Sequence, residues 1–149
     1  MDCALTGNGL SGPLAQSDAA AFDKQLQINL ETAYLTTRAF LPFVRNAKGS
    51  IVFFGSEAVL EGARTSGVAA YVAAKSAVVA LMRSVADEGR EYGVRANALA
   101  PAAIRTATNE SSMGGDARFV EREDVAATVA FLCSPAAAAI TGQIIRLRR

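Results

Sequence analysis

The chain lacks the residues that most often carry acid–base and metal chemistry. It has no histidine among its 149 residues and only two cysteines, Cys3 and Cys133. These cysteines lie far apart in the sequence and form no CxxC motif, which favours two small buried thiols in a reducing compartment. The sequence therefore gives no indication of a metal site, and any proton transfer must use other side chains.

Excess charge of either sign is also lacking. The formal net charge is +1, and basic residues cluster only in residues 146–149. Such a balance gives no electrostatic reason to expect a nucleic acid or an anionic membrane as a partner. No signal segment opens the chain, and no apolar run approaches the ~18 residues that span a bilayer. We therefore expect a cytoplasmic protein of one domain.

What the chain does contain is an alternation of apolar patterns. Helical spacing of apolar residues predicts three helices, at residues 19 to about 46, 68 to about 91, and 123–132. Short apolar runs predict four strands, at residues 3–6, 50–55, 94–99 and 143–147. Pro42 is expected to kink or end the first helix. Alternating strands and helices are typical of an α/β fold with a parallel sheet.

The second helix carries a tyrosine and a lysine four residues apart, Tyr71 and Lys75. This spacing places both side chains on one face of a helix. An ammonium group beside a phenol favours the phenolate and lowers the phenol pKa, so the pair could transfer a proton. The alternative is a core tyrosine next to a solvated amine.

A glycine motif near the start of the chain has two interpretations. Residues 7–12 match the G-x-G-x-x-G pattern that can cradle a pyrophosphate after a strand. Pro13 follows directly, and Ser17-Asp18 is the better helix start. The sequence therefore favours a turn over a phosphate loop.

Several collinear motifs resemble the short-chain dehydrogenase/reductase family, in its classical branch that includes 3-oxoacyl-carrier-protein reductases. The Tyr71–Lys75 spacing matches that family's YxxxK motif. The other matching segments are Ile28-Asn29-Leu30, Gly49-Ser-Ile-Val-Phe-Phe-Gly-Ser56, Val94-Arg-Ala-Asn97-Ala-Leu-Ala-Pro101 and Ile140-Thr-Gly142-Gln143. The resemblance implies a Rossmann-like, doubly wound parallel sheet with flanking helices.

The resemblance also implies a role for each matching residue. Tyr71 would be the general acid/base, and Lys75 would lower its pKa and bind the nicotinamide ribose. Ser56 would hold the substrate oxygen, with Ser66 as the less favoured alternative, and Asn29 would anchor a water that links Lys75 to solvent. NAD or NADP is the implied cofactor, and its contacts would come from Tyr71, Lys75, Pro101, Ala102, Ile104, Thr106, Asn8 and Gly9.

The chain also departs from the family pattern. The family begins with a TGxxxGxG loop and further β–α steps that hold the adenosine half of the cofactor, and the sequence has no counterpart. Residues 1–149 are therefore expected to form the C-terminal, catalytic portion of a single Rossmann-like domain, truncated to about four strands. The family's asparagine-rich turn is Thr6-Gly-Asn-Gly9 here, and Ala102 replaces a glycine.

Two functions follow from these matches and departures. The first is an NAD(P)-dependent oxidoreductase that interconverts a carbonyl and a secondary alcohol on a small molecule. The second is a non-catalytic remnant that serves as an oligomerisation or binding module. In both cases the resemblance implies a homodimer or homotetramer, formed through the helices around Asn29 and Tyr71.

Overall fold

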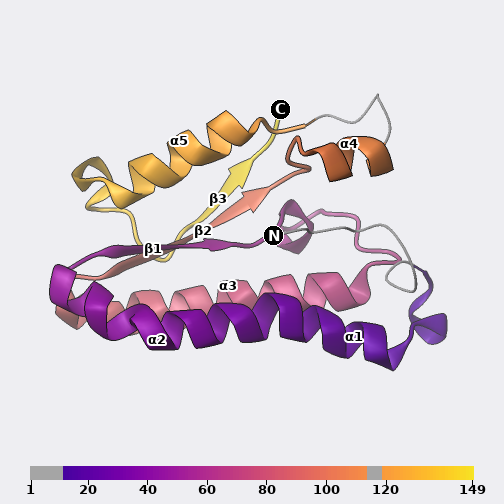
Figure 1. The fold of residues 1–149 in the computed structure, drawn as a ribbon, viewed down its shortest axis with the longest axis horizontal. Helices are drawn as coiled ribbons and strands as arrows, with labels where there is room; N and C mark the ends of the chain where they lie inside the picture. The colour runs from indigo at the N-terminus through magenta and orange to yellow at the C-terminus, as the bar shows by residue number, and fades with distance from the viewer. Residues whose placement is uncertain (1–11, 114–118) are drawn as a thin grey trace.

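Three parallel strands form the centre of the protein. The computed structural model describes residues 12–113 and 119–149. Strands β1 (Ser50–Phe54), β2 (Arg95–Pro101) and β3 (Ile144–Leu147) pair in the order β1-β2-β3. The predicted α/β fold is thereby confirmed (Figure 1). The strand predicted at residues 3–6 lies outside the described residues.

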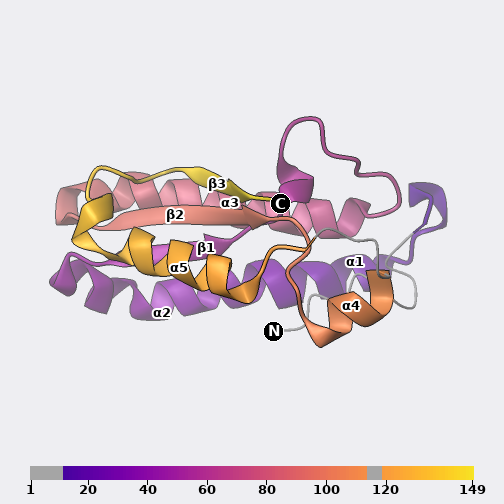
Figure 2. The same cartoon turned by 90° about the horizontal axis from the view of Figure 1, so that it is seen from above.

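Helices cover both faces of this sheet, as Figures 1 and 2 show. Helix α3 (Ala69–Gly89) and the long helix α1 (Ala19–Gln25), η2 (Leu26–Glu31) and α2 (Thr32–Ala47) lie on one face, and α5 (Arg122–Cys133) lies on the other. The connections between strands are helical, as parallel pairing requires. The doubly wound arrangement places every loop that follows a strand at one edge of the sheet.

Strand β2 is buried on both faces, and its side chains alternate between two cores. Ala96 and Ala98 pack with Val78 and Met82 of α3. Leu99 belongs to a second cluster with Leu132 of α5 and with Val120, Val125 and Ala137. Side chains in a strand point to opposite faces in turn, so one strand serves both layers. The small alanines on the α3 side let that helix approach the sheet closely.

The buried polar residue Asn97 ties β2 to the turn before β3. Its side chain is fully buried. Asn97 Nδ2 donates to the Ile140 carbonyl oxygen at 2.9 Å, and Asn97 Oδ1 accepts from the Gln143 amide at 3.1 Å. A buried amide that satisfies two loop groups costs little and fixes the loop.

The first predicted helix forms, but Pro42 neither ends it nor marks its irregular part. Asp18 caps the helix by accepting from the Ala20 amide at 3.0 Å. The helix runs past Pro42 to Ala47, and Lys48 ends it in the left-handed conformation at φ 48°. Pro42 removes one hydrogen bond of α2, and the helix continues because its neighbour Leu41 packs against the core. The irregular segment is η2, a π-helical stretch that begins at Leu26.

Short helices complete the chain between the main elements. These are η1 (Leu14–Gln16), η3 (Glu57–Val59), η4 (Arg90–Tyr92), α4 (Ala107–Met113) and η5 (Pro135–Ala137). The residues after β2 thus contain a helix, α4, that the apolar pattern does not indicate.

Two further expectations can be compared with the structure. Cys133 is exposed at the end of α5, so the prediction of a buried thiol is wrong there, and Cys3 lies outside the described residues. Among the described residues, one helix, Ala69–Tyr92, is long and apolar enough to cross a membrane by length and composition alone. Its side chains Val78 and Met82 are in the core against the sheet, as in the core helix of an α/β domain.

Candidate active site

The site lies where β1 and β2 end. Parallel strands bring their carboxyl ends to one edge of a sheet, so the loops that follow them meet there. A cavity of about 880 Å³ opens at this edge, within the size range of ligand pockets. Its wall includes Ser56 after β1, Pro101 at the end of β2 with the loop that follows to Ile104, and side chains from η2 and α3.

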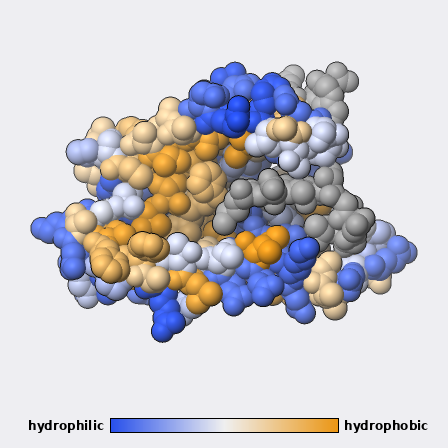
Figure 3. Space-filling model, in the orientation of Figure 1, coloured by the Kyte–Doolittle hydropathy of each residue, from blue (hydrophilic) through white to orange (hydrophobic). Residues whose placement is uncertain are grey.

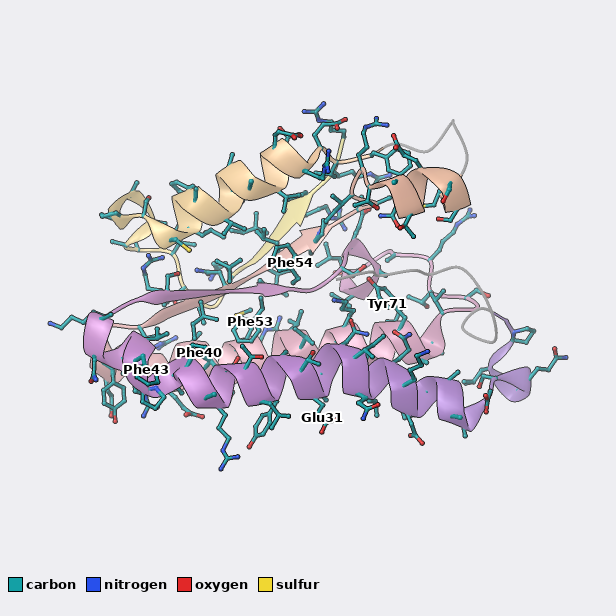
Figure 4. The ribbon with its side chains drawn as sticks, in the orientation of Figure 1. Glu31, Phe40, Phe43, Phe53, Phe54 and Tyr71 are labelled. Atoms are coloured by element: carbon teal, nitrogen blue, oxygen red, sulfur yellow. The ribbon has the colours of Figure 1, made fainter. Side chains whose placement is uncertain are left out.

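All four predicted catalytic side chains line this cavity: Asn29, Ser56, Tyr71 and Lys75. They come from three separate parts of the chain, η2, the loop after β1, and α3. Figure 4 shows Tyr71 on the side of α3 that faces the sheet. The tyrosine is 8% exposed, so the sheet and helices hold its ring while the cavity gives access to it.

Lys75 is held in place by the end of β1. Its Nζ donates to the Phe54 carbonyl oxygen at 3.0 Å and lies 6.0 Å from the centroid of the Tyr71 ring. The helix places Lys75 one turn after Tyr71, and the carbonyl oxygen at the end of β1 fixes the position of the ammonium group. A positive charge is thereby positioned beside the phenol.

Ser56 combines a local structural role with access to the cavity. It is buried, and its Oγ accepts from the Ala58 amide at 3.2 Å, which caps η3. A hydroxyl can accept and donate at once, so its proton remains able to bond a substrate oxygen. Ser66 is exposed and does not line the cavity. This arrangement favours Ser56 over Ser66.

Asn29 is oriented by Gln25, a residue that no sequence motif marks. Asn29 Nδ2 donates to the Gln25 side-chain oxygen at 3.0 Å and to the Gln25 carbonyl oxygen at 3.1 Å. Gln25 is 5% exposed and also lines the cavity. The signal that could have found it is the spacing of four residues on a helix, which brings two amide side chains together.

The predicted cofactor contacts separate into three groups. Pro101, Ala102 and Ile104 line the cavity. Thr106 does not line it. Its Oγ1 accepts from the Asn109 amide at 3.2 Å at the start of α4, and its contact with a cofactor stays a prediction. Asn8 and Gly9 lie outside the described residues.

Asn109 lines the cavity in addition to the predicted residues. Its Nδ2 donates to the Ile104 carbonyl oxygen at 2.7 Å, so it holds the loop after β2 to α4. No sequence pattern indicates this role, because a polar residue in a short polar helix has no periodic spacing to mark it.

The donor set fits the nicotinamide end of a dinucleotide. An ammonium group, a phenol and an apolar loop after β2 line a single cavity that is large enough for a ring and a small substrate. No group of three or more potential metal ligands occurs within residues 12–113 and 119–149.

Comparison with known proteins identifies the family of the chain. The family model described as enoyl-(acyl carrier protein) reductase matches residues 2–147. The chain is 36% identical to 2-(S)-hydroxypropyl-CoM dehydrogenase 3 of Xanthobacter autotrophicus over 148 residues, which covers 88% of the chain and 57% of that protein. It is 35% identical to a hydroxy-methyl-oxo-hexahydroindene-carboxyl-CoA reductase of Mycobacterium tuberculosis, covering 97% of the chain and 60% of the relative.

Solved structures give the same result. The 3-ketoacyl-(acyl-carrier-protein) reductase of Brucella melitensis, complexed with NADH, superposes with a TM-score of 0.84 at 26% identity, over 96% of this chain and 63% of that one. Levodione reductase superposes with a TM-score of 0.83 at 30% identity, over 94% and 61%. The chain thus spans less than two thirds of these relatives. On this evidence the chain belongs to the short-chain dehydrogenase/reductase family.

Proposed function

We propose that this chain carries the catalytic residues of an NAD(P)-dependent oxidoreductase that interconverts a carbonyl and a secondary alcohol. The observation that carries the proposal is the convergence of Ser56, Tyr71 and Lys75 on one cavity, which the loop after β2 also lines. Relatives named as dehydrogenases and reductases support the same chemistry. The proposal places the protein in the cytoplasm, as the expected reducing compartment suggests.

In this proposal Tyr71 is the general acid/base. Its hydroxyl gives a proton to the substrate oxygen in the reductive direction and takes it back in the oxidative direction. Lys75 places its charge beside the phenol and so favours the deprotonated state of Tyr71 during the reaction. NAD(P), when held by these residues, would supply the hydride chemistry at the substrate carbon.

Ser56 and Asn29 prepare the site for that proton transfer. The Ser56 hydroxyl donates to the substrate oxygen and holds it within reach of Tyr71. Asn29 holds a water between Lys75 and solvent, and the hydrogen bonds from Asn29 to Gln25 fix the asparagine in the orientation it needs. Asn29 and Gln25 are therefore positioning residues.

The proposal is tested by the substitution Tyr71→Phe with Tyr92→Phe as its matched control. Tyr92 is 44% exposed and its ring faces Arg45, away from the cavity. Removing the proton donor should lower kcat by about 10²–10⁴-fold. Cofactor binding, measured by calorimetry with NADH and NADPH, should persist in both variants. Unchanged turnover in Tyr71→Phe would remove Tyr71 from the mechanism, and no binding of either cofactor at millimolar concentration to the unsubstituted chain would contradict the enzyme proposal.

A second candidate function, the oligomerisation module, is supported by exposed apolar side chains on one long helix. The side chains that are large, apolar and exposed along α1, η2 and α2 are Phe22, Ile28, Tyr34, Leu35, Phe40 and Phe43. Surfaces of this kind often mark an interface. We propose that this helix, together with α3, forms a homodimer or homotetramer, which is compatible with either function.

A further inference from the structure

The cavity wall carries an excess of positive charge, and of its cationic side chains only Lys75 takes part in the proposed proton transfer. Among the described residues, four cationic side chains line the cavity, namely Arg64, Lys75, Arg146 and Arg148, against two anionic ones, Glu57 and Glu61. The whole chain has a formal net charge of only +1, so this wall concentrates cations. Clefts lined by one sign of charge raise the local concentration of ligands of the opposite sign.

Two of these cations stand together at the end of β3. Arg146 lies in β3 and Arg148 two residues later, a spacing that keeps side chains on one side of an extended chain. Arg146 Nε lies 3.7 Å and Arg148 Nη1 lies 3.4 Å from the same oxygen, Oε1 of Glu57. A single carboxylate therefore faces two guanidinium groups and leaves one positive charge unbalanced.

The guanidinium donors of this pair remain available to a ligand. Within residues 12–113 and 119–149, neither Arg146 nor Arg148 donates a side-chain hydrogen bond to another residue. Their side chains are 46% and 65% exposed, whereas that of Glu57 is 23% exposed. Arginine presents a planar fork of donors that matches a carboxylate or a phosphate in a bidentate geometry. Lys75 differs from this pair, because it donates to the Phe54 carbonyl oxygen.

The pair is also on the substrate side of the site. Glu57 directly follows Ser56, the residue proposed to hold the reacting oxygen. We propose that Arg146 and Arg148 bind an anionic group, a carboxylate or a phosphate, that the carbonyl substrate carries away from its reacting carbon. This inference rests on the proposed function and adds the class of substrate: anionic ketones or the corresponding hydroxy acids and phosphates. Glu57 holds the two arginines together until the anion arrives.

The test measures binding rather than turnover. The probes are 4-oxopentanoate and its methyl ester, which share a ketone and differ in one negative charge. Their dissociation constants for the full chain are measured by ligand-observed NMR. The carboxylate should bind at least about fivefold more tightly than the ester at low salt, and the preference should fall as ionic strength rises. Equal affinity for the two probes would overturn the proposal.

Three variants make the result specific. Arg146→Gln with Arg148→Gln should abolish the preference for the carboxylate, and Glu57→Gln should increase it by removing the competing carboxylate. Arg149→Gln is the control, because Arg149 pairs with Asp124 and does not line the cavity. This variant should prefer the carboxylate over the ester as strongly as the unsubstituted chain does. A preference that survives in the double variant would overturn the assignment. Thermal melts by circular dichroism confirm that each variant is folded.

The anionic group that the two arginines bind could instead belong to the cofactor. Titration with NADH and NADPH distinguishes the cofactor phosphates from an anion on the substrate. If the double variant weakens binding of the cofactors but keeps the preference for the carboxylate probe, the arginines serve cofactor phosphates and the substrate assignment is wrong. None of these measurements requires catalysis. A chain that is inactive but still prefers the carboxylate would therefore contradict the proposed function while supporting the anion site.

Discussion

At the scale of single residues, several side chains of the site also support the local backbone. Ser56 caps η3 through its oxygen and presents its proton to the cavity. Lys75 is tied to the end of β1, so its charge has a defined position beside Tyr71. Because these side chains have both a structural and a chemical role, substituting one of them can change geometry and chemistry together. Each substitution therefore needs a control at a residue of the same type outside the site.

Ser56 and Ser66 provide that comparison. Ser56→Ala should lower kcat/KM for ketone reduction by about 10²–10³-fold, the usual cost of removing a hydrogen-bond donor to the reacting oxygen. It should also lower the free energy of unfolding by about 1 kcal/mol, because the cap of η3 is lost. Ser66→Ala should change neither, since Ser66 is exposed and outside the cavity wall. Cofactor absorbance and urea unfolding measure the two effects. Equal losses in both variants would contradict the assignment of Ser56.

At the scale of elements, the sequence predicted what long periodic patterns can specify. The sequence predicts the helices at residues 19–46 and 68–91 because an apolar face recurs over many turns. The π-helical stretch η2 could not be found, because one widened turn barely changes that spacing. Helix α4 is short and polar, so no apolar face marks it. Its position depends on contacts made by Arg105, which only the tertiary structure brings together.

Arg105 is the connection between α4 and α5. Its Nη1 donates to Glu110 of α4 at 2.8 Å, and its Nε donates to both oxygens of Glu121 at 3.0 Å. Its guanidinium also lies 4.9 Å from the centroid of the Phe119 ring. The two carboxylates stabilise the charged form and raise the pKa of Arg105, with the hydrogen bond to Glu110 as the largest cause. These contacts hold the helix that carries Asn109 against the cavity.

Removing this connection should loosen α4 alone. Arg105→Gln should speed amide hydrogen exchange in Ala107–Met113 several-fold while leaving α3 unchanged. Among the described residues, the bonds that Asn109 of α4 makes to Thr106 and Ile104 reach only the neighbouring loop. The control is Arg90→Gln. Arg90 also pairs with a carboxylate, Asp87, and both side chains are exposed and do not line the cavity. Exchange is followed by mass spectrometry of peptic peptides. Faster exchange throughout the chain would show that Arg105 supports the global fold instead.

At the scale of the whole molecule, the order of the strands accounts for what the sequence could and could not show of the site. Ser56 and the loop after β2 meet because both follow parallel strands. The resemblance to the family implies a place in the site for each of them, but not how they come together. The approach of Arg146 and Arg148 to Glu57 depends on the register of β3 against β2, where Pro101 lies opposite Leu147. No local pattern encodes that register, so the cationic wall became evident only in the structure.

A large apolar surface lies between α2 and α5, on the side of β1 away from β2 (Figure 3). Within the described residues β1 pairs only with β2, and Phe54 of β1 is 43% exposed. Together with the apolar side chains on α1, η2 and α2, this surface gives the described part of the chain two exposed apolar regions. The proposed assembly uses the helices.

Self-association should therefore depend on the long helix. Leu35 of α2 is 49% exposed and lies away from the cavity. Leu35→Glu should lower the sedimentation coefficient toward that of a 15.5 kDa monomer, because a charge would be buried without a partner at the interface. Phe131→Glu is the control, since Phe131 is 45% exposed on α5, across the sheet from α2. Sedimentation velocity over a range of concentrations measures both. If Phe131→Glu dissociates the assembly and Leu35→Glu does not, the interface lies on the α5 side and the assignment to the helices around Asn29 and Tyr71 is wrong.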